Sequence, residues 1–161
     1  MASNRHLGRI VALQTLYELD FRVEVEEKNL DKSAILQRNI DRYSEVVDDK
    51  VFIEELVEGV TVKQDELDAI IQPVAPDWPL SQIARIDKVI LRMGVYELYY
   101  SPNVPKKVII NEAVELAKSF GADNSSKFIN GVLGTVLKNL EADSPIKKPT
   151  AKKTEAKKVS K

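Results

Sequence analysis

Hydrophobic side chains recur along this chain at the three- and four-residue spacing of amphipathic helices. In the first half, a broad apolar arc predicts a helix over residues 4–21, and three narrower stripes follow it. These stripes contain Leu36, Ile40, Tyr43 and Val47, then Ile53, Leu56, Val57 and Val60, then Leu67, Ile70 and Ile71. Asp48 and Asp49 offer a break and an N-cap between the first two stripes. The pattern predicts three or four helices and shows no convincing strand alternation.

A stiff connector with three prolines, PVAPDWP over residues 73–79, follows this half, and we expect Trp78 to anchor it. Ser81 is the predicted cap of the next helix, which runs from Ile83 to Tyr100. That helix is apolar nearly all round, except for a polar stripe of Arg85, Lys88 and Arg92. A helix of this kind is expected at the centre of the fold, buried by several neighbours.

Two amphipathic helices complete the second half, after a predicted turn at Ser101-Pro102-Asn103. The first covers residues 108–120, with Phe120 on its inward side, and Gly121 is expected to end it in the left-handed conformation. Asp123 or Asn124 can cap the second. Its core stripe consists of Ile129, Val132, Leu133, Val136, Leu137 and Leu140.

Composition supports this all-α prediction. Hydrophobic residues make up 43% of the 161-residue chain, and there are only 6 Gly and 7 Pro. One domain over residues 1–143 is therefore expected, with helical halves at about 1–72 and 80–140 joined by the proline-rich connector. Residues 144–161 contain seven Lys and almost no apolar side chains, so a disordered basic tail is expected.

The formal net charge of −1 hides an asymmetry between this tail and the rest of the chain. The tail carries +6, whereas the preceding 143 residues carry 17 Lys and Arg against 24 Asp and Glu. A globally basic nucleic-acid binder is therefore excluded, but a local basic patch is not. For the tail itself, a solubilising role and a sequence-independent tether to phosphate both remain open.

Catalytic and metal-binding patterns are missing from the sequence. There is no Cys, one His, and no nucleophile elbow or phosphate-binding glycine motif. We therefore expect no enzyme activity, no metal and no cofactor. Without a secretory signal or a membrane-spanning apolar run, the expected location is the cytoplasm.

Two groups of residues are candidates for binding. Arg5, His6 and Arg9 form a small basic edge on the first helix, although charge alone favours an ordinary solvated face, because three residues form a weak footprint. The second group lies around the start of the last helix. There, backbone N–H groups can bind phosphate, polar side chains can bind base edges, and an aromatic ring can stack on an unpaired base. It consists of Lys118, Asn124, Ser125, Lys127 and Phe128. Here the alternative is that Asn124 caps the helix and Phe128 belongs to the core.

Gly131 and Gly134 add a further observation inside this last helix. Each glycine costs about 1 kcal/mol relative to Ala, which suggests the close approach of a neighbouring helix or of a partner's backbone. The sequence does not distinguish these two possibilities.

Four segments carry a resemblance to a known family. They are RIVALQTLYELDF near the N-terminus, and ILRMGVYEL, VPKKVIINEAVELAKSFG and SSKFINGVL in the second half. Together they resemble the NusB family of bacterial transcription antitermination factors. The resemblance implies two small helical bundles packed together. It also implies pairing with NusE, a small-subunit ribosomal protein, and binding of boxA-type single-stranded RNA. Read-through by the RNA polymerase antitermination complex, notably in ribosomal RNA operons, is the expected outcome.

The resemblance also implies roles for individual residues. Arg5, His6 and Arg9 match the arginine-rich N-terminus of the family, and Lys118, Ser125, Lys127 and Phe128 match its RNA-facing segment. Asn124 stands where relatives often carry an acid, so a repulsion toward phosphate is removed there. Tyr17 and Asp87 match the NusE-facing surface. Two alternatives stay open: an RNA-binding domain like that of rRNA 5-methylcytosine methyltransferases, and a helical interaction module without RNA binding.

Overall fold

The computed structural model describes residues 4–75 and 79–143. In this part of the chain every regular element is helical, which confirms the all-α prediction. The elements are α1 (Asn4–Glu24), α2 (Lys32–Arg42), α3 (Lys50–Val62), α4 (Gln64–Ile71), the 3₁₀ turns η1 (Gln72–Val74) and η2 (Leu80–Gln82), α5 (Arg85–Tyr100), α6 (Lys106–Phe120) and α7 (Ser125–Asp143). Trp78 and the Lys-rich tail lie outside the described residues.

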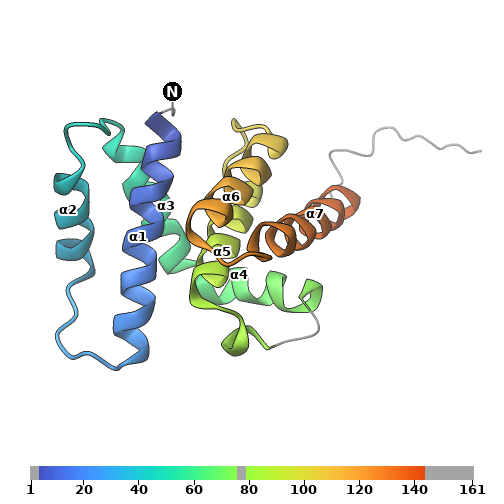
Figure 1. Ribbon diagram of the computed structural model, residues 1–161, viewed down its shortest axis with the longest axis horizontal. Helices are drawn as coiled ribbons and strands as arrows, with labels where there is room; N and C mark the ends of the chain where they lie inside the picture. The colour runs from blue at the N-terminus through green and yellow to red at the C-terminus, as the bar shows by residue number, and fades with distance from the viewer. Residues whose placement is uncertain (1–3, 76–78, 144–161) are drawn as a thin grey trace, which may run out of the picture.

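Two helical groups pack side by side, with α5 between them (Figure 1). The first group is α1, α2 and α3; the second is α4, α6 and α7, and α5 contacts α1 and α3 as well as all three of these. Its side chains Val89, Ile90, Leu91, Met93, Val95 and Leu98 are all at most 2% exposed. The prediction of a central helix buried by several neighbours is confirmed.

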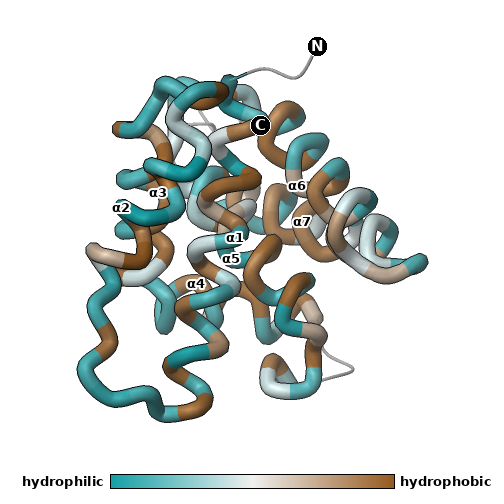
Figure 2. Tube along the Cα trace, turned by 60° about the vertical axis from the view of Figure 1, so that its left-hand side comes forward, coloured by the Kyte–Doolittle hydropathy of each residue, from teal (hydrophilic) through white to brown (hydrophobic). Residues whose placement is uncertain are grey.

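Along most helices, apolar residues recur among polar ones at the spacing that the sequence shows, so these helices each have an apolar face that can be buried (Figure 2). On α7, Ile129, Val132, Leu133 and Val136 are buried and Leu137 and Leu140 pack partly against them, as predicted. On α3, the predicted stripe from Ile53 to Val60 is also buried. Burial of these stripes supplies most of the driving force for the fold, because apolar area removed from water is the dominant favourable contribution.

Two of the predicted helix boundaries change in the structure, and one predicted cap is confirmed. Asp49 caps α3 as expected, since its side chain accepts a hydrogen bond from the Phe52 amide at 3.1 Å. The helix containing Leu36, however, ends at Arg42, and Val47 reaches the core from the following turn. Ser81 does not cap α5, because it lies within a 3₁₀ turn and α5 begins at Arg85 after an extended Ala84.

Gly121 ends α6, but in an extended rather than a left-handed conformation, with φ −95° and ψ −173°. The reason for glycine there is steric. A Cβ at this position would lie 2.6 Å from the Ser125 side chain and 2.8 Å from the Ala117 carbonyl oxygen. The tight α6–α7 turn therefore requires glycine for close approach, and backbone strain plays no part.

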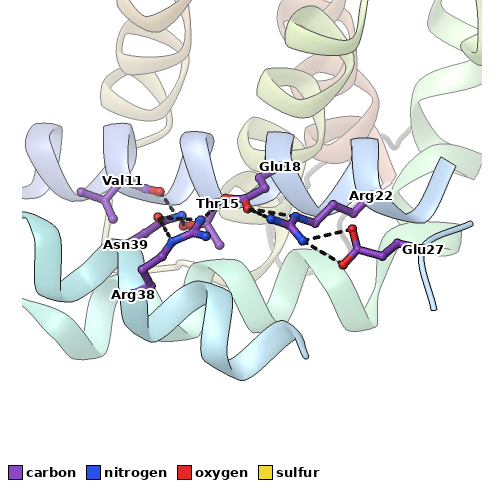
Figure 3. A network of polar contacts seen from close by, with 7 residues as sticks. All are labelled: Val11, Thr15, Glu18, Arg22, Glu27, Arg38 and Asn39. Atoms are coloured by element: carbon purple, nitrogen blue, oxygen red, sulfur yellow. Dashed lines mark hydrogen bonds and ion pairs between the residues drawn. The ribbon is translucent and has the colours of Figure 1, made fainter. Parts of the chain in front are cut away.

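A polar network fastens α2 onto α1 (Figure 3). The Thr15 hydroxyl donates to the Val11 carbonyl and accepts from the Asn39 side-chain amide, each at 2.9 Å, and both side chains are buried. Nearer the surface, Glu18 accepts hydrogen bonds from Arg22 and Arg38. Since the two buried groups satisfy each other, this polar contact sets the register of α2 without leaving a buried group unpaired.

The polar stripe of α5 points at the first group of helices. Asp20 on α1 accepts from Arg85 at 2.9 Å and from Arg92 at 3.1 Å, and the Lys88 ammonium lies 3.4 Å away. Arg92 also forms a two-point contact with Asp68 on α4. Burial alone would raise the pKa of Asp20, but the hydrogen bond from Arg85 and the charges of Lys88 and Arg92 hold that pKa below its usual value.

Candidate nucleic-acid and partner interface

The predicted basic edge of α1 divides into exposed and buried residues. Arg5 is exposed, its Nε lies 3.2 Å from Asp49 Oδ2, and its guanidinium carbon lies 4.3 Å from the centre of the Phe52 ring. His6 is partly exposed, with Nδ1 at 2.9 Å from Glu112 Oε1. These two side chains sit at the surface where a phosphate can approach them.

Arg9 does not belong to that exposed edge, and the expectation that it does is wrong. The residue is 3% exposed, and its Nε and Nη2 donate to the two carboxylate oxygens of Glu97 at 2.9 and 2.8 Å. Its Nη1 donates to Glu112 at 3.4 Å. Burial would lower the pKa of Arg9, but the hydrogen bonds and charges of these carboxylates raise it. Arg9 therefore joins α1 to α5 and α6, and its charge is already neutralised.

Glu97 and Glu112 are the residues that sequence reasoning missed here. Glu97 carries a charge within the buried part of α5 and is itself 3% exposed, so a partner of opposite charge is required. That requirement is visible in the sequence. The identity of the partner is not, because Arg9 lies 88 positions away.

The α6–α7 turn brings the second predicted group together. The Asn124 carbonyl accepts the first hydrogen bond of α7, from the Phe128 amide at 3.1 Å, which places Asn124 at the N-cap position. Lys127 is exposed, and Lys118 is exposed with its Nζ 3.3 Å from Glu115. Asn124 and Lys127 lie at the start of α7, where free backbone N–H groups favour an anion, whereas Lys118 lies in the last turn of α6.

Ser125 faces inward. It is 4% exposed, and its hydroxyl accepts a hydrogen bond from the Ala122 amide at 2.9 Å, so its side chain closes the turn. Phe128 is intermediate between the two possibilities raised by the sequence. Its ring packs partly against the core and also lines two surface hollows.

Asp87 lies beside Phe128. The two residues share a hollow of about 290 Å³ with Gln82, Ile83 and Ala84, and a hollow of about 470 Å³ with the turn from Ala122 to Ser125. The carboxylate thus faces the α6–α7 turn. The resemblance places Asp87 with Tyr17, whereas the structure groups it with Phe128 and Asn124.

Tyr17 lines a separate, largely apolar hollow of about 390 Å³, together with Leu13, Gln14, Ile86 and Phe120. The side chains of Tyr17, Phe21 and Phe120 are 40–48% exposed. The inward orientation predicted for Phe120 is wrong, because this residue ends α6 beyond the side chains that cover the rest of the helix. An exposed aromatic cluster of this kind is typical of protein-binding surfaces.

Gly131 and Gly134 have open space beside them. A Cβ built at either position meets no atom within 4 Å in the part of the chain that the structure describes. Close approach of a neighbouring helix within this chain therefore does not account for them.

The NusB family model matches residues 6–138. The chain belongs to the NusB family. A transcription antitermination protein NusB of Chloroflexus aggregans is 42% identical over 139 residues, which cover 85% of this chain and 89% of the relative. The NusB of Geotalea uraniireducens is 39% identical over 142 residues, covering 83% and 94%.

Solved structures of NusB proteins share the fold. A T. maritima NusB has a TM-score of 0.75 and 29% identity, covering 86% of this chain and 93% of its own. A structure of the antitermination factors NusB and NusE in complex with dsRNA has a TM-score of 0.73 at 21% identity, covering 86% and 99%. The NusB fold is thus confirmed for this chain. Within residues 4–75 and 79–143, no helix is both long and apolar enough to cross a membrane.

Proposed function

We propose that this protein is a transcription antitermination factor that pairs with a NusE-type ribosomal protein and binds boxA-type single-stranded RNA. It acts in the cytoplasm, on nascent transcripts held by RNA polymerase. The observation that carries the proposal is the junction of two unlike surfaces in a NusB-family fold. An apolar hollow around Tyr17 and a polar hollow at the α6–α7 turn take consecutive residues of α5, Ile86 and Asp87, into their walls, and the exposed Lys127 lies on the first turn of α7.

The two surfaces suit different ligands. The Tyr17 hollow offers exposed aromatic area with few charges, the composition of a protein-binding core. The α6–α7 turn offers Lys118 and Lys127 for phosphate, the N-terminus of α7 for an anion, and the Phe128 ring for a base. Ile86 lines the first surface and Asp87 the second, so consecutive positions of α5 contribute to both, and one heterodimer can use both surfaces at once.

The N-terminal contribution to RNA binding is smaller than the family pattern implies. Arg5 and His6 remain at the surface, whereas Arg9 is buried in an ion pair with Glu97. Fewer neutralised phosphates mean lower affinity and a weaker dependence on salt. The isolated protein is therefore expected to bind RNA weakly, and the partner should supply the remaining contacts.

The test is a titration of labelled boxA-type RNA and of a scrambled RNA, with and without NusE, at several salt concentrations. Discrimination in favour of the boxA sequence is expected in the presence of NusE. The variant Lys127→Ala should weaken binding to both RNAs and reduce the slope of log affinity against log salt by about 0.7, the value for one phosphate contact on a single strand.

The variant Lys28→Ala, in the loop between α1 and α2, removes the same charge away from the interface and serves as the control. The variant Tyr17→Ala should weaken NusE binding and leave the salt slope unchanged. Absence of sequence discrimination both with and without NusE would refute the proposed function.

A further inference from the structure

Three tyrosine rings gather at the C-terminal end of α5, at the opposite end of that helix from the Tyr17 hollow. The ring centres of Tyr96 and Tyr100 lie 5.1 Å apart, and those of Tyr99 and Tyr100 lie 6.5 Å apart. Tyr99 and Tyr100 are 36% and 38% exposed. The proposed pairing and RNA binding make no use of these rings, so their exposure points to a separate contact.

Two carboxylates give this part of the surface a negative charge. The Tyr100 hydroxyl donates a hydrogen bond to Glu66 on α4. Partial burial raises the pKa of Tyr99, and the charges of Asp143, at the end of α7, and of Glu66 raise it further. Since α7 has no basic residue in its last turn, nothing within the helix offsets the negative end of its dipole. Tyr99, Tyr100, Glu66 and Asp143 together form the tyrosine surface, which favours a cation.

Two lysines in the described part of the chain show which cation suits this region. Lys63 Nζ lies 4.7 Å from the centre of the Tyr100 ring and 4.0 Å from Glu66 Oε1. Lys106 Nζ donates to a carbonyl in the last turn of α5 at 2.7 Å. Ammonium groups bind both to tyrosine faces and to the carbonyls at a helix C-terminus. Within residues 4–75 and 79–143, no cation lies over the Tyr99 ring, so a further ammonium group can bind there.

We propose that residues 144–161 of the same chain are the ligand of the tyrosine surface in the free protein. This segment follows Asp143 directly and carries seven Lys against one Glu. Its first lysines, Lys147 and Lys148, can reach at most about 18 Å from Asp143, a range that includes its surroundings on α4 and α5. Because the segment is tethered, its local concentration is about millimolar, so a basic segment of another molecule at lower concentration competes poorly with it.

The experiment places a nitroxide spin label on the whole chain and follows the amide NMR signals that the label broadens. The chain has no Cys, so Ser160→Cys gives one attachment point at the far end of the segment. At low salt, the amide signals of Tyr99 and Glu66 should lose most of their intensity. Those of α2, on the opposite side of the molecule from α7, should be unaffected (Figure 1). At about 1 M salt, where charges act over only about 3 Å, the lost intensity should return.

Two variants and a matched control test the surface itself. Glu66→Gln removes one of its charges and Tyr99→Leu removes one of its rings, and each should reduce the intensity loss at Tyr100 several-fold. Glu55→Gln removes the same charge from an exposed position in the middle of α3 and should keep the full loss. All three substituted side chains are exposed, so the variants should fold, and their amide spectra report this directly.

Three outcomes would overturn the inference. Broadening that survives both high salt and Glu66→Gln shows only that the segment is attached nearby. Broadening of α2 as strong as that of Tyr99 shows a general attraction to acidic residues. Broadening between a spin-labelled chain and a second, isotope-labelled chain, but not within one chain, assigns the tyrosine surface to another copy.

The contact has a consequence for RNA binding, which rests on the proposed function. Lysines held at Glu66 and Asp143 are unavailable to phosphate, whereas the dense charge of RNA should displace the segment. Adding a scrambled single-stranded RNA at low salt should therefore restore the Tyr99 signal. If the signal stays broadened while RNA binds, the competition is refuted and the contact stands. Because the contact is measured without RNA, equal binding of boxA and scrambled RNA would count against the proposed function alone.

Discussion

The pair of Arg9 and Glu97 is the most direct test of how the N-terminal helix is held. The two side chains are each 4% exposed, and two parallel hydrogen bonds of 2.8 and 2.9 Å join them. Replacing Arg9 by Met keeps the apolar length of the side chain but leaves the Glu97 carboxylate buried without its main partner. Breaking a buried pair in this way costs about 3–5 kcal/mol.

The double variant Arg9→Met/Glu97→Met should be more stable than either single variant, because both charges and their desolvation disappear together. Urea unfolding followed by circular dichroism at helical wavelengths gives the free energies for all four proteins. For a chain of this size, a loss of about 3–5 kcal/mol corresponds to a fall in Tm of about 10 °C.

Arg5→Met is the matched control for this cycle. Arg5 lies one turn earlier on the same helix, is 51% exposed, and pairs with Asp49 at the surface. An exposed pair contributes about 0–1 kcal/mol, so this variant should unfold close to the unmodified protein. If Arg9→Met were equally harmless while reducing RNA affinity, the assignment of Arg9 to the interior would be refuted.

Outcomes are expected for four further variants. Gly131→Ala should raise the free energy of unfolding in urea by about 1 kcal/mol, because the new methyl group enters open space. Gly59→Ala should lower it by about 1–3 kcal/mol, because the Tyr96 side chain lies 2.2–2.4 Å from the position of the new Cβ. Asp20→Asn should lower Tm at pH 7. Since the pKa of Asp20 is lowered by folding, its stabilisation is present above about pH 4 and lost as pH falls further, so the two melting curves should converge in acid. Asn124→Asp should weaken RNA binding several-fold in filter-binding titrations, by placing a charge near phosphate; an unchanged affinity would contradict the position of Asn124 at the interface.

Much of the fold could be predicted from local pattern alone. The stripe on α7 and the nearly all-apolar surface of α5 each specify which face is buried, because helical periodicity is a property of a short window of sequence. The helix start predicted at Ser81 was wrong, because a residue that can cap a helix can equally well lie within a 3₁₀ turn. Gly121 ends its helix for a steric reason that depends on the following helix, so its conformation could not be foreseen.

The candidate site was harder to predict, because its residues come from separate helices. Arg9 looks like a surface cation until Glu97 and Glu112 are seen beside it. Asp87 and Phe128 are 41 positions apart, and only the packing of α7 against α5 puts them on the same hollow. Periodicity identifies the buried face of each helix, but it does not say which exposed residues of different helices become neighbours.

Two of the ionic contacts that join α1 to α5 have a consequence for how this surface binds. Arg9 fastens one end of the helix to α5 and α6, and Asp20 fastens the other end to α5, about 16 Å away at the helical rise. If the two helical groups moved apart, these ion pairs would break and a charged side chain would lose its partner. We therefore expect both groups to exchange their amide hydrogens as one cooperative unit. The junction between the two binding surfaces is assembled before any ligand arrives, so association need not supply the entropy of ordering it.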